Sequence, residues 1–392
     1  MHLGSYIYIS NDMCPSLKNR RLGICIADDR MSSETGLRLL VLSLHKYIPN
    51  IPVELFFPCA QAPFEVWLQG HPQVRLHKRD VSKAAGWDIK PDAMLWMLDQ
   101  GYERAVWIDS DIIVTSEFLF KLIDLDRQTL VITEEALGPK DRDDRLSLRA
   151  RKWGFEVGRG FGDVLNTCVL SVTDAHISLL KHWNELMNVD AYRLAQTKIF
   201  YERPIELQGD QDVLTALLTS VAHADVDLAI LKRGKQIVQF YELSGYTLVE
   251  RIGNLLCGGP DFIHCPGRRP WLLFEEISTM TAARDRILVS YHDVSPYKMV
   301  SLQYRQEIGL NTDWMSDWYY TGKLQRVLGL NSVIASGALW ALVIDFSRVT
   351  KKFLLKAQEA ARRVIDLIAC LPVIYRTRVA KFRNGTGPTD SD

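Results

Sequence analysis

The stretch that decides the fold is residues 105–114, Ala105-Val106-Trp107-Ile108-Asp109-Ser110-Asp111-Ile112-Ile113-Val114. Its apolar first half predicts a buried strand that ends at two carboxylates one residue apart. Carboxylates cannot lie unpaired in a dry interior without a large cost in free energy or protonation. Oxygen ligands of this kind suit hard divalent cations such as Mg²⁺ or Mn²⁺, which commonly carry a substrate phosphate. The alternative is a strand that ends in a solvated turn, where Asp makes local hydrogen bonds.

The composition is that of an ordinary globular protein. With 392 residues the chain can form one large α/β domain with an appendage, or two domains. Its 47 basic and 47 acidic residues balance, so no global field directs it to nucleic acid. The seven cysteines are scattered without a C-x-x-C pair, which predicts neither a disulfide framework nor a zinc finger. The first 15 residues show no secretory signal pattern, and we therefore expect a cytoplasmic protein.

Strand-like and helix-like segments alternate along the chain, which favours an α/β fold with a mostly parallel sheet. Strands are predicted at 21–27, 53–57, 74–77, 105–108, 130–133, 168–172, 227–231 and 262–264. Helices are predicted to open near Ser33, Lys90, Asp174 and Gly209. Residues 138–162 are rich in charged residues and glycine, which predicts a mobile loop near the site or an ordinary surface excursion.

The C-terminal region, residues 279–383, is expected to be helical and partly basic, with a disordered tail at 384–392. Its apolar segment 332–346 is shorter than the roughly 20 residues that a membrane-spanning helix needs. From 348 to 383, ten Lys and Arg residues stand against two acidic ones. An amphipathic helix on an anionic membrane would have this pattern, and so would a helical hairpin packed on the domain with a solvated basic face.

Polar residues gather where predicted strands end, just before one strand begins, or where a helix opens. The groups are Asp28-Asp29, Asp109-x-Asp111, Asn166-Thr167, Asp210-Gln211-Asp212 and His264-Cys265-Pro266-Gly267-Arg268-Arg269-Pro270-Trp271. Ligands of open α/β sheets bind outside the carboxyl ends of the strands, so these groups point to one crevice.

In order and spacing these groups resemble the GT-A class of nucleotide-sugar-dependent glycosyltransferases. The closest resemblance is to the retaining glycosyltransferase family 8, which includes bacterial lipopolysaccharide galactosyl- and glucosyltransferases and glycogenin, and it covers about residues 21–271. It implies a Rossmann-like GT-A domain over residues 20–278, with a mostly parallel sheet flanked by helices and a helical C-terminal extension. It also implies transfer of a sugar from a nucleotide-diphosphate sugar such as a UDP-hexose to a glycan, lipid-linked or protein hydroxyl, with retention of configuration.

The resemblance also implies roles for individual residues. Asp109, Asp111 and His264 would bind Mn²⁺ or Mg²⁺. Asp210 and Gln211 would lie beside the anomeric carbon and act in catalysis. The donor-binding residues would be Asp28, Asp29, Lys90, Ser110, Asn166, Thr167, Gly267 and Arg269, with Asp28 on the nucleotide base and Arg269 on the diphosphate.

Plainer interpretations exist for three of these residues. His264 could be a satisfied buried histidine, Asp210 a helix N-cap, and Lys90 a solvated helix entry. The chain also departs from the family pattern, since Arg30-Met31 stands where Asn-Tyr is common and puts the base and ribose contacts in doubt.

Two other functions are open. A haloacid-dehalogenase-type phosphatase also places Asp-x-Asp after an apolar strand and would use Asp109 as its nucleophile, although Ile112-Ile113 fits that family poorly. A catalytically inactive scaffold could keep the same fold.

Overall fold

The computed structural model describes residues 22–80, 86–117, 122, 125–135, 143–161, 165–240, 248–257, 259–276, 295–310, 312–316, 346 and 350. The chain divides into two compact units, Met1–Gly337 and Ala338–Asp392. The elements that follow all belong to the first unit.

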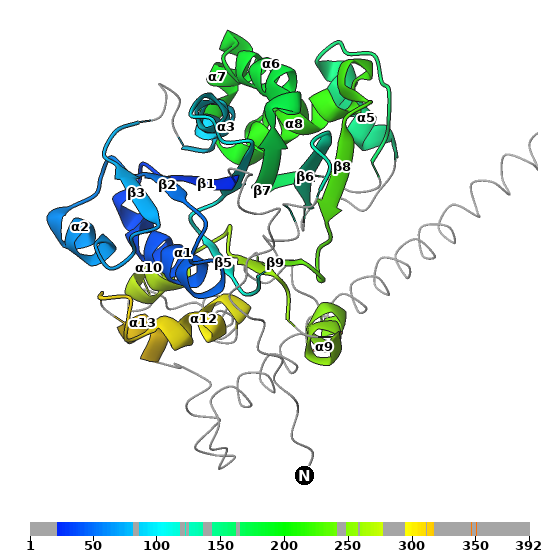
Figure 1. Cartoon of the computed structure of the whole chain (residues 1–392). Helices are drawn as coiled ribbons and strands as arrows, with labels where there is room; N and C mark the ends of the chain where they lie inside the picture. The colour runs from blue at the N-terminus through cyan, green and yellow to red at the C-terminus, as the bar shows by residue number, and fades with distance from the viewer. Residues whose placement is uncertain are drawn as a thin grey trace, which may run out of the picture. The chain divides into compact units, whose positions relative to one another are not determined.

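A seven-stranded sheet, in the order β3-β2-β1-β4-β7-β6-β8, forms the centre of this unit (Figure 1). Its strands are β1 (Leu22–Ala27), β2 (Val53–Phe56), β3 (Val74–His77), β4 (Arg104–Ile108), β6 (Thr129–Glu134), β7 (Leu165–Thr173) and β8 (Asp227–Leu231). β7 runs antiparallel to its neighbours β4 and β6, and the other pairings in this sheet are parallel. A mostly parallel sheet between helices confirms the predicted α/β fold class.

Helices cover both faces of the sheet because successive strand residues point to opposite sides. Ile24 and Ile26 of β1 belong to the core that includes α1 (Glu34–Tyr47), whereas Cys25 belongs to the core that includes α3 (Lys90–Asp99). The second core also contains α6 (Ile177–Met187) and α8 (Asp210–Thr219). Figure 1 shows α3, α6 and α8 on one side of the sheet and α1 on the other.

A second, three-stranded sheet continues the chain after the Asp-x-Asp turn, residues 109–111. In it β5 (Ile112–Val114) pairs antiparallel with β10 (Phe262–His264), which pairs parallel with β9 (Ile237–Gln239). The register places His264 opposite Ile112. This pairing brings His264 to the Asp-x-Asp turn although the two are far apart in sequence.

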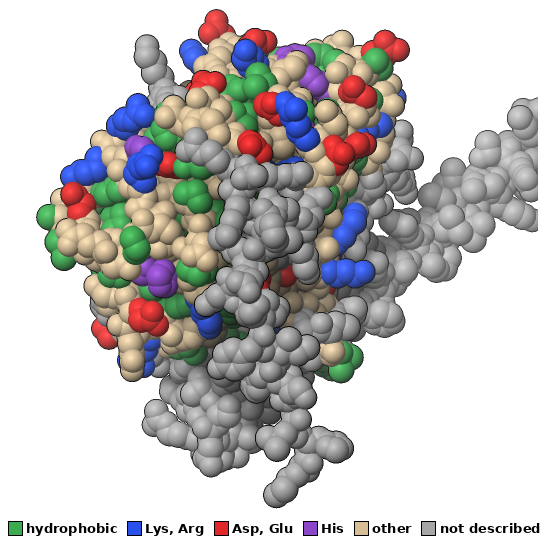
Figure 2. All heavy atoms as spheres, viewed as in Figure 1, with side chains coloured by type: hydrophobic (Ala, Val, Ile, Leu, Met, Phe, Trp, Pro, Cys, Tyr) green, Lys and Arg blue, Asp and Glu red, His purple; other side chains and the backbone are tan. Residues whose placement is uncertain are grey.

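The remaining described helices surround these sheets. They are α2 (Ala62–Leu68), α5 (Asp143–Lys152), α7 (Asp190–Gln196), α9 (Leu248–Cys257), α10 (Pro270–Glu276), α12 (Pro296–Ser301) and α13 (Asp313–Ser316). Figure 2 shows acidic and basic side chains interspersed over the described part of the visible face, as the balanced composition suggests.

Residues 296–310 and 312–316 also belong to the first unit, and two of them contact its helices. Arg38 on α1 donates to the Ile308 carbonyl at 2.9 Å, and Trp67 on α2 donates to the Glu307 carbonyl at 2.9 Å. The predicted limits of the catalytic domain and the C-terminal region stay predictions. Within the described part of the chain, no helix has both the length and the apolar character to cross a membrane. Apart from Phe346 and Thr350, the predicted apolar and basic segments and the tail lie outside the described residues.

The prediction of a loop over residues 138–162 is wrong for residues 143–152, which form α5. This helix is held by tertiary contacts, because Arg149 is buried and its Nε donates to Asp212 Oδ1 on α8 at 2.8 Å. Few apolar residues mark the segment, so its sequence alone resembles a surface loop.

Two local boundaries also differ from the predictions. Asn166 and Thr167 lie within β7 rather than before it, because neighbouring polar groups satisfy their side chains inside the fold. The helix predicted to open near Asp174 is preceded by a turn that Thr173 caps, since Thr173 Oγ1 accepts a hydrogen bond from the Ala175 amide at 3.3 Å.

Candidate active site

A cavity of about 510 Å³ opens at the edge where β1 and β4 end. Because β7 runs in the opposite direction, its first residues, Asn166 and Thr167, reach the same edge. Every predicted site residue lines the cavity: Asp28, Asp29, Lys90, Asp109, Ser110, Asp111, Asn166, Thr167, Asp210, Gln211, His264, Gly267 and Arg269. The structure thus brings these residues together, and their individual roles stay predictions.

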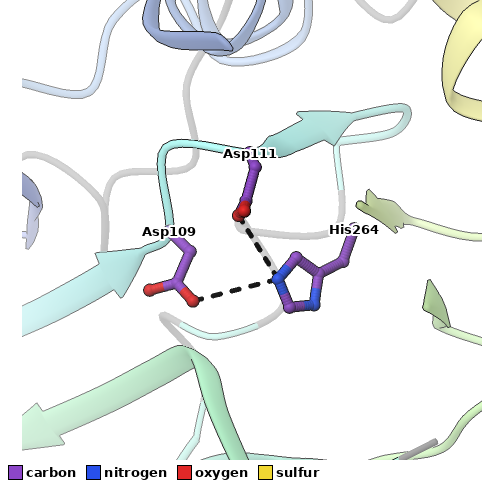
Figure 3. A group of neighbouring side chains, drawn as sticks. All are labelled: Asp109, Asp111 and His264. Carbon is purple, nitrogen blue, oxygen red and sulfur yellow. Dashed lines mark ion pairs between the residues drawn. The ribbon is translucent and has the colours of Figure 1, made fainter. Parts of the chain in front are cut away.

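Asp109, Asp111 and His264 converge on one point (Figure 3). His264 Nε2 lies 3.3 Å from Asp111 Oδ1 and 3.9 Å from Asp109 Oδ2. The three ligand atoms that these residues offer all lie within 4.8 Å of one another. Two carboxylates and one imidazole form a donor set that suits Mn²⁺ or Mg²⁺, so these residues fit a divalent ion.

The pKa values of the two carboxylates in the turn shift in opposite directions. Burial would raise the pKa of Asp111, but His264 and Arg269 lower it to about 2. Burial raises the pKa of Asp109 above its ordinary value, in spite of the neighbouring Lys90. For His264 burial lowers the pKa, but Cys168 and Asp111 raise it well above its ordinary range. Burial thus disfavours the charged form of Asp109, and a bound cation would stabilise that form.

Lys90 joins the turn to the start of α8. It opens α3, and its side chain is only 5% exposed. Its Nζ lies 3.2 Å from Asp109 Oδ1 and 3.1 Å from Asp210 Oδ2, and it donates to Thr167 Oγ1 at 2.8 Å. The interpretation of Lys90 as a solvated helix entry is therefore wrong, because its ammonium group is the buried counter-ion of two carboxylates.

Asp210 does not act as a helix N-cap. Gly209 occupies the N-cap position of α8 and no side chain caps it. The Asp210 carboxylate instead accepts a hydrogen bond from Thr167 Oγ1 at 2.6 Å and pairs with Lys90. Asp210 is buried, so this pairing decides its orientation.

Glu135 is a site residue that the sequence reasoning missed. It follows β6 and is buried, and its Oε2 accepts hydrogen bonds from Asn166 Nδ2 at 2.6 Å and from Gln211 Nε2 at 3.1 Å. Asn166 Nδ2 also donates to Gln211 Oε1 at 3.0 Å. Glu135 and Asn166 therefore fix the Gln211 carboxamide. The signal in the sequence was Glu134-Glu135 directly after an apolar strand, the same pattern as Asp28-Asp29.

The loop after β10 is tied to the start of α1. Arg269 Nη1 donates to Ser33 Oγ at 2.8 Å, and Trp271 Nε1 donates to the Ser32 carbonyl at 3.0 Å. Arg269 Nη2 lies 3.7 Å from Asp111 Oδ2. Gly36 lets α1 approach closely, because a Cβ there would lie 2.6 Å from the carbonyl oxygen of Ser110. The guanidinium is thus held beside the possible metal ligands.

Comparisons with known proteins assign no family. No protein-family model matches the chain, and no curated protein matches its sequence. Among solved structures it is similar to the apo bifunctional glycosyltransferase WbbM, at 13% identity and a TM-score of 0.42, over 64% of this chain and 47% of that one. The chain therefore spans about half the length of that protein.

Two further structures are similar at a comparable level. The galactosyltransferase LgtC, in complex with donor and acceptor sugar analogues, is 14% identical with a TM-score of 0.41, over 73% of this chain and 99% of that one. The glycosyltransferase GlyE of Streptococcus pneumoniae is 14% identical with a TM-score of 0.39, over 73% of this chain and 64% of that one. Membership of glycosyltransferase family 8 stays a prediction.

Proposed function

We propose that the protein is a metal-dependent glycosyltransferase that moves a sugar from a nucleotide-diphosphate sugar, a UDP-hexose, to a hydroxyl acceptor with retention of configuration. The observation that carries the proposal is the convergence of Asp109, Asp111 and His264 in a cavity that also holds Lys90 and Arg269. Such a cavity supplies a cation site with fixed positive groups around it, which a nucleoside diphosphate requires. Mn²⁺ or Mg²⁺ would be the ion.

The residues around the ion would bind and orient the leaving group. When bound, the ion would neutralise charge that develops on the departing diphosphate. Arg269 would bind diphosphate oxygens, because Ser33 and Asp111 hold its guanidinium at the edge of the cavity. Lys90 would hold Asp109 and Asp210 in place, since both carboxylates lie near its Nζ.

Gln211 would stabilise positive charge at the anomeric carbon through its amide oxygen. Its Nε2 donates to Glu135 and its Oε1 accepts from Asn166, so the carboxamide has one orientation and its oxygen keeps a second lone pair. An amide oxygen beside an oxocarbenium-like centre stabilises positive charge. The acceptor would be a glycan, lipid-linked or protein hydroxyl.

The phosphatase alternative is not favoured by this arrangement. A nucleophilic Asp109 needs a free carboxylate oxygen, but Oδ1 accepts from Trp107 Nε1 at 2.7 Å and pairs with Lys90, and Oδ2 faces His264.

The test is release of nucleoside diphosphate from a panel of nucleotide sugars with Mn²⁺, Mg²⁺ or EDTA. We expect turnover of one donor that requires metal, that is lost in Asp111→Asn, and that is kept in the control Asp174→Asn, an exposed carboxylate that pairs with Arg127. The anomeric configuration of the product, read by NMR, tests retention. Hydrolysis of p-nitrophenyl phosphate in place of donor turnover would contradict the proposal. If calorimetry also detects no donor binding, the inactive scaffold is the better account.

A further inference from the structure

Asp28, which the resemblance assigns to the nucleotide base, has no acceptor capacity left. Its Oδ1 accepts from the Arg30 amide at 2.9 Å and from Arg30 Nε at 3.0 Å. Its Oδ2 accepts from Arg30 Nη2 at 2.7 Å and from Ser110 Oγ at 2.5 Å. A carboxylate offers about four lone-pair sites, and all four are taken here. Burial would raise the pKa of Asp28, but the bonds from Arg30 and Ser110 lower it, so the group stays ionised and paired.

Arg30 stands where the base contact was expected. Its side chain is 54% exposed and lines the cavity, whereas the Asp28 side chain is 2% exposed. Because Nε and Nη2 grip the carboxylate as a fork, the opposite Nη1–Nη2 edge is left open, and Nη1 has no hydrogen-bond partner among the described residues. Ser110, which shares Asp28 with Arg30, is the middle residue of the Asp-x-Asp turn. Asp28 thus holds the Arg30 guanidinium at a fixed position relative to the possible metal ligands Asp109 and Asp111.

The lining of the cavity is acidic as a whole, with six aspartates against four Lys and Arg residues. An anion is therefore favoured only beside a local group of positive side chains. Lys90 is committed to Asp109 and Asp210, whereas Arg30 and Arg269 both lie near the Asp-x-Asp turn and are held there by hydrogen bonds. A guanidinium edge matches a pair of phosphate oxygens in both geometry and charge, and gains less from the neutral oxygens of a base.

We propose that Arg30 is a specificity-determining residue that binds the diphosphate of the donor through its open edge, with Asp28 as the residue that positions it. This inference rests on the proposed function, because it requires a nucleoside diphosphate in the cavity. It replaces the base contact implied for Asp28 by a phosphate contact that belongs to this chain's own Arg30.

Calorimetry with UDP, GDP, ADP and CDP and their monophosphates, in EDTA and in Mn²⁺, tests the inference. Arg30→Gln should bind the preferred diphosphate about tenfold to a hundredfold more weakly than wild type under both conditions. Binding of the matching monophosphate should change less than about threefold, since the lost contact is to the second phosphate. Arg30→Lys should recover part of the loss, because it keeps the charge but not the fork. Arg127→Gln, another exposed arginine paired with one aspartate, should bind as wild type does.

The outcomes separate this inference from the proposed function. Equal weakening of diphosphate and monophosphate would place Arg30 on the nucleoside or the first phosphate and overturn its contact with the second phosphate. Unchanged affinity in a folded Arg30→Gln protein would leave Arg30 as a partner of Asp28 only, which also overturns it. Asp28→Asn offers a second variant. If Asp28 positions Arg30, this variant weakens diphosphate binding and adds little to Arg30→Gln in the double variant. Failure of wild type to bind any nucleoside diphosphate would overturn both proposals.

Discussion

Replacing Lys90 by methionine should destabilise the fold strongly, because the Lys90 ammonium group is the buried counter-ion of two carboxylates. Its Nζ lies 3.2 Å from Asp109 Oδ1 and 3.1 Å from Asp210 Oδ2, and its side chain is 5% exposed. Methionine keeps most of the length of the side chain and removes the charge. Breaking a buried ion pair by removing one partner costs about 3–5 kcal/mol, and we expect a loss in that range at pH 7.

The pH dependence of this loss has a definite sign. In the variant the carboxylates keep their desolvation but lose their cation, so their folded pKa values rise above the unfolded ones. The stability of the variant should therefore recover as pH falls through those raised values, and the gap to wild type should narrow between neutral and acidic pH. In wild type, the pKa of Lys90 is raised by Asp109 and Asp210 although burial lowers it. As far as the titration of Lys90 itself is concerned, its contribution is complete below pH 10.5, its ordinary pKa, and declines at higher pH.

Urea unfolding of both proteins across this pH range measures the effect. Lys78→Met is a matched control, since Lys78 pairs with Glu65 at 2.5 Å but the two side chains are 50% and 41% exposed. An exposed pair contributes about 0–1 kcal/mol, so this control should be nearly neutral. A loss below about 1 kcal/mol for Lys90→Met, equal to the control and independent of pH, would refute the reasoning.

Three further predictions concern the neighbouring contacts. Gly36→Ala should lower the free energy of unfolding by about 1–3 kcal/mol and weaken Mn²⁺ binding, because the new Cβ would lie 2.6 Å from a carbonyl oxygen of the Asp-x-Asp turn. The control is Gly253→Ala, at a helical glycine whose Cβ would have nothing within 4 Å, and it should be neutral or stabilising in the same urea unfolding experiment. Burial raises the pKa of Asp212 from 3.8 to about 6, so the unfolding free energy of wild type relative to Asp212→Asn should fall by no more than about 3 kcal/mol as pH rises from 4 to 6; a flat difference would argue against this shift. Glu135→Gln should lower kcat about tenfold with KM little changed, since one amide loses its acceptor and Gln211 can turn; equal kinetics would show that Gln211 needs no such support.

Much of the fold could be predicted from the sequence, because parallel strands buried on both faces are continuous apolar runs. β1 and β4 lie within one residue of their predicted limits for that reason. α5 could not be predicted, since it is stabilised by the buried pair between Arg149 and Asp212 rather than by an apolar stripe. Such a pair joins segments that are remote in sequence, and no local pattern encodes it.

The site was predicted less evenly than the fold. Carboxylates at strand ends identified the Asp-x-Asp turn on physical grounds alone, because buried charge needs a partner. The place of His264 depends on the pairing of β10 with β5, and only the resemblance suggested it. Two contacts were not predicted: the hydrogen bond from Asn166 to Glu135, and the ion pair of Arg30 with Asp28. Each joins side chains in a way that a single sequence does not specify.

The loop that carries Arg269 and Trp271 has a consequence for how the protein is made. Its hydrogen bonds to Ser33 and Ser32 span 236 and 239 residues, which makes them among the most non-local contacts in the molecule. Contacts of such long range form late, because the closure entropy of the intervening chain must be overcome first. A ribosome must therefore release the chain well beyond residue 271 before the cavity can close. Until then the carboxylates of Asp109 and Asp111 lack their imidazole and guanidinium partners. Pulse-labelling of nascent chains with a protease probe should find the Asp-x-Asp turn and the loop that carries Arg269 protected last.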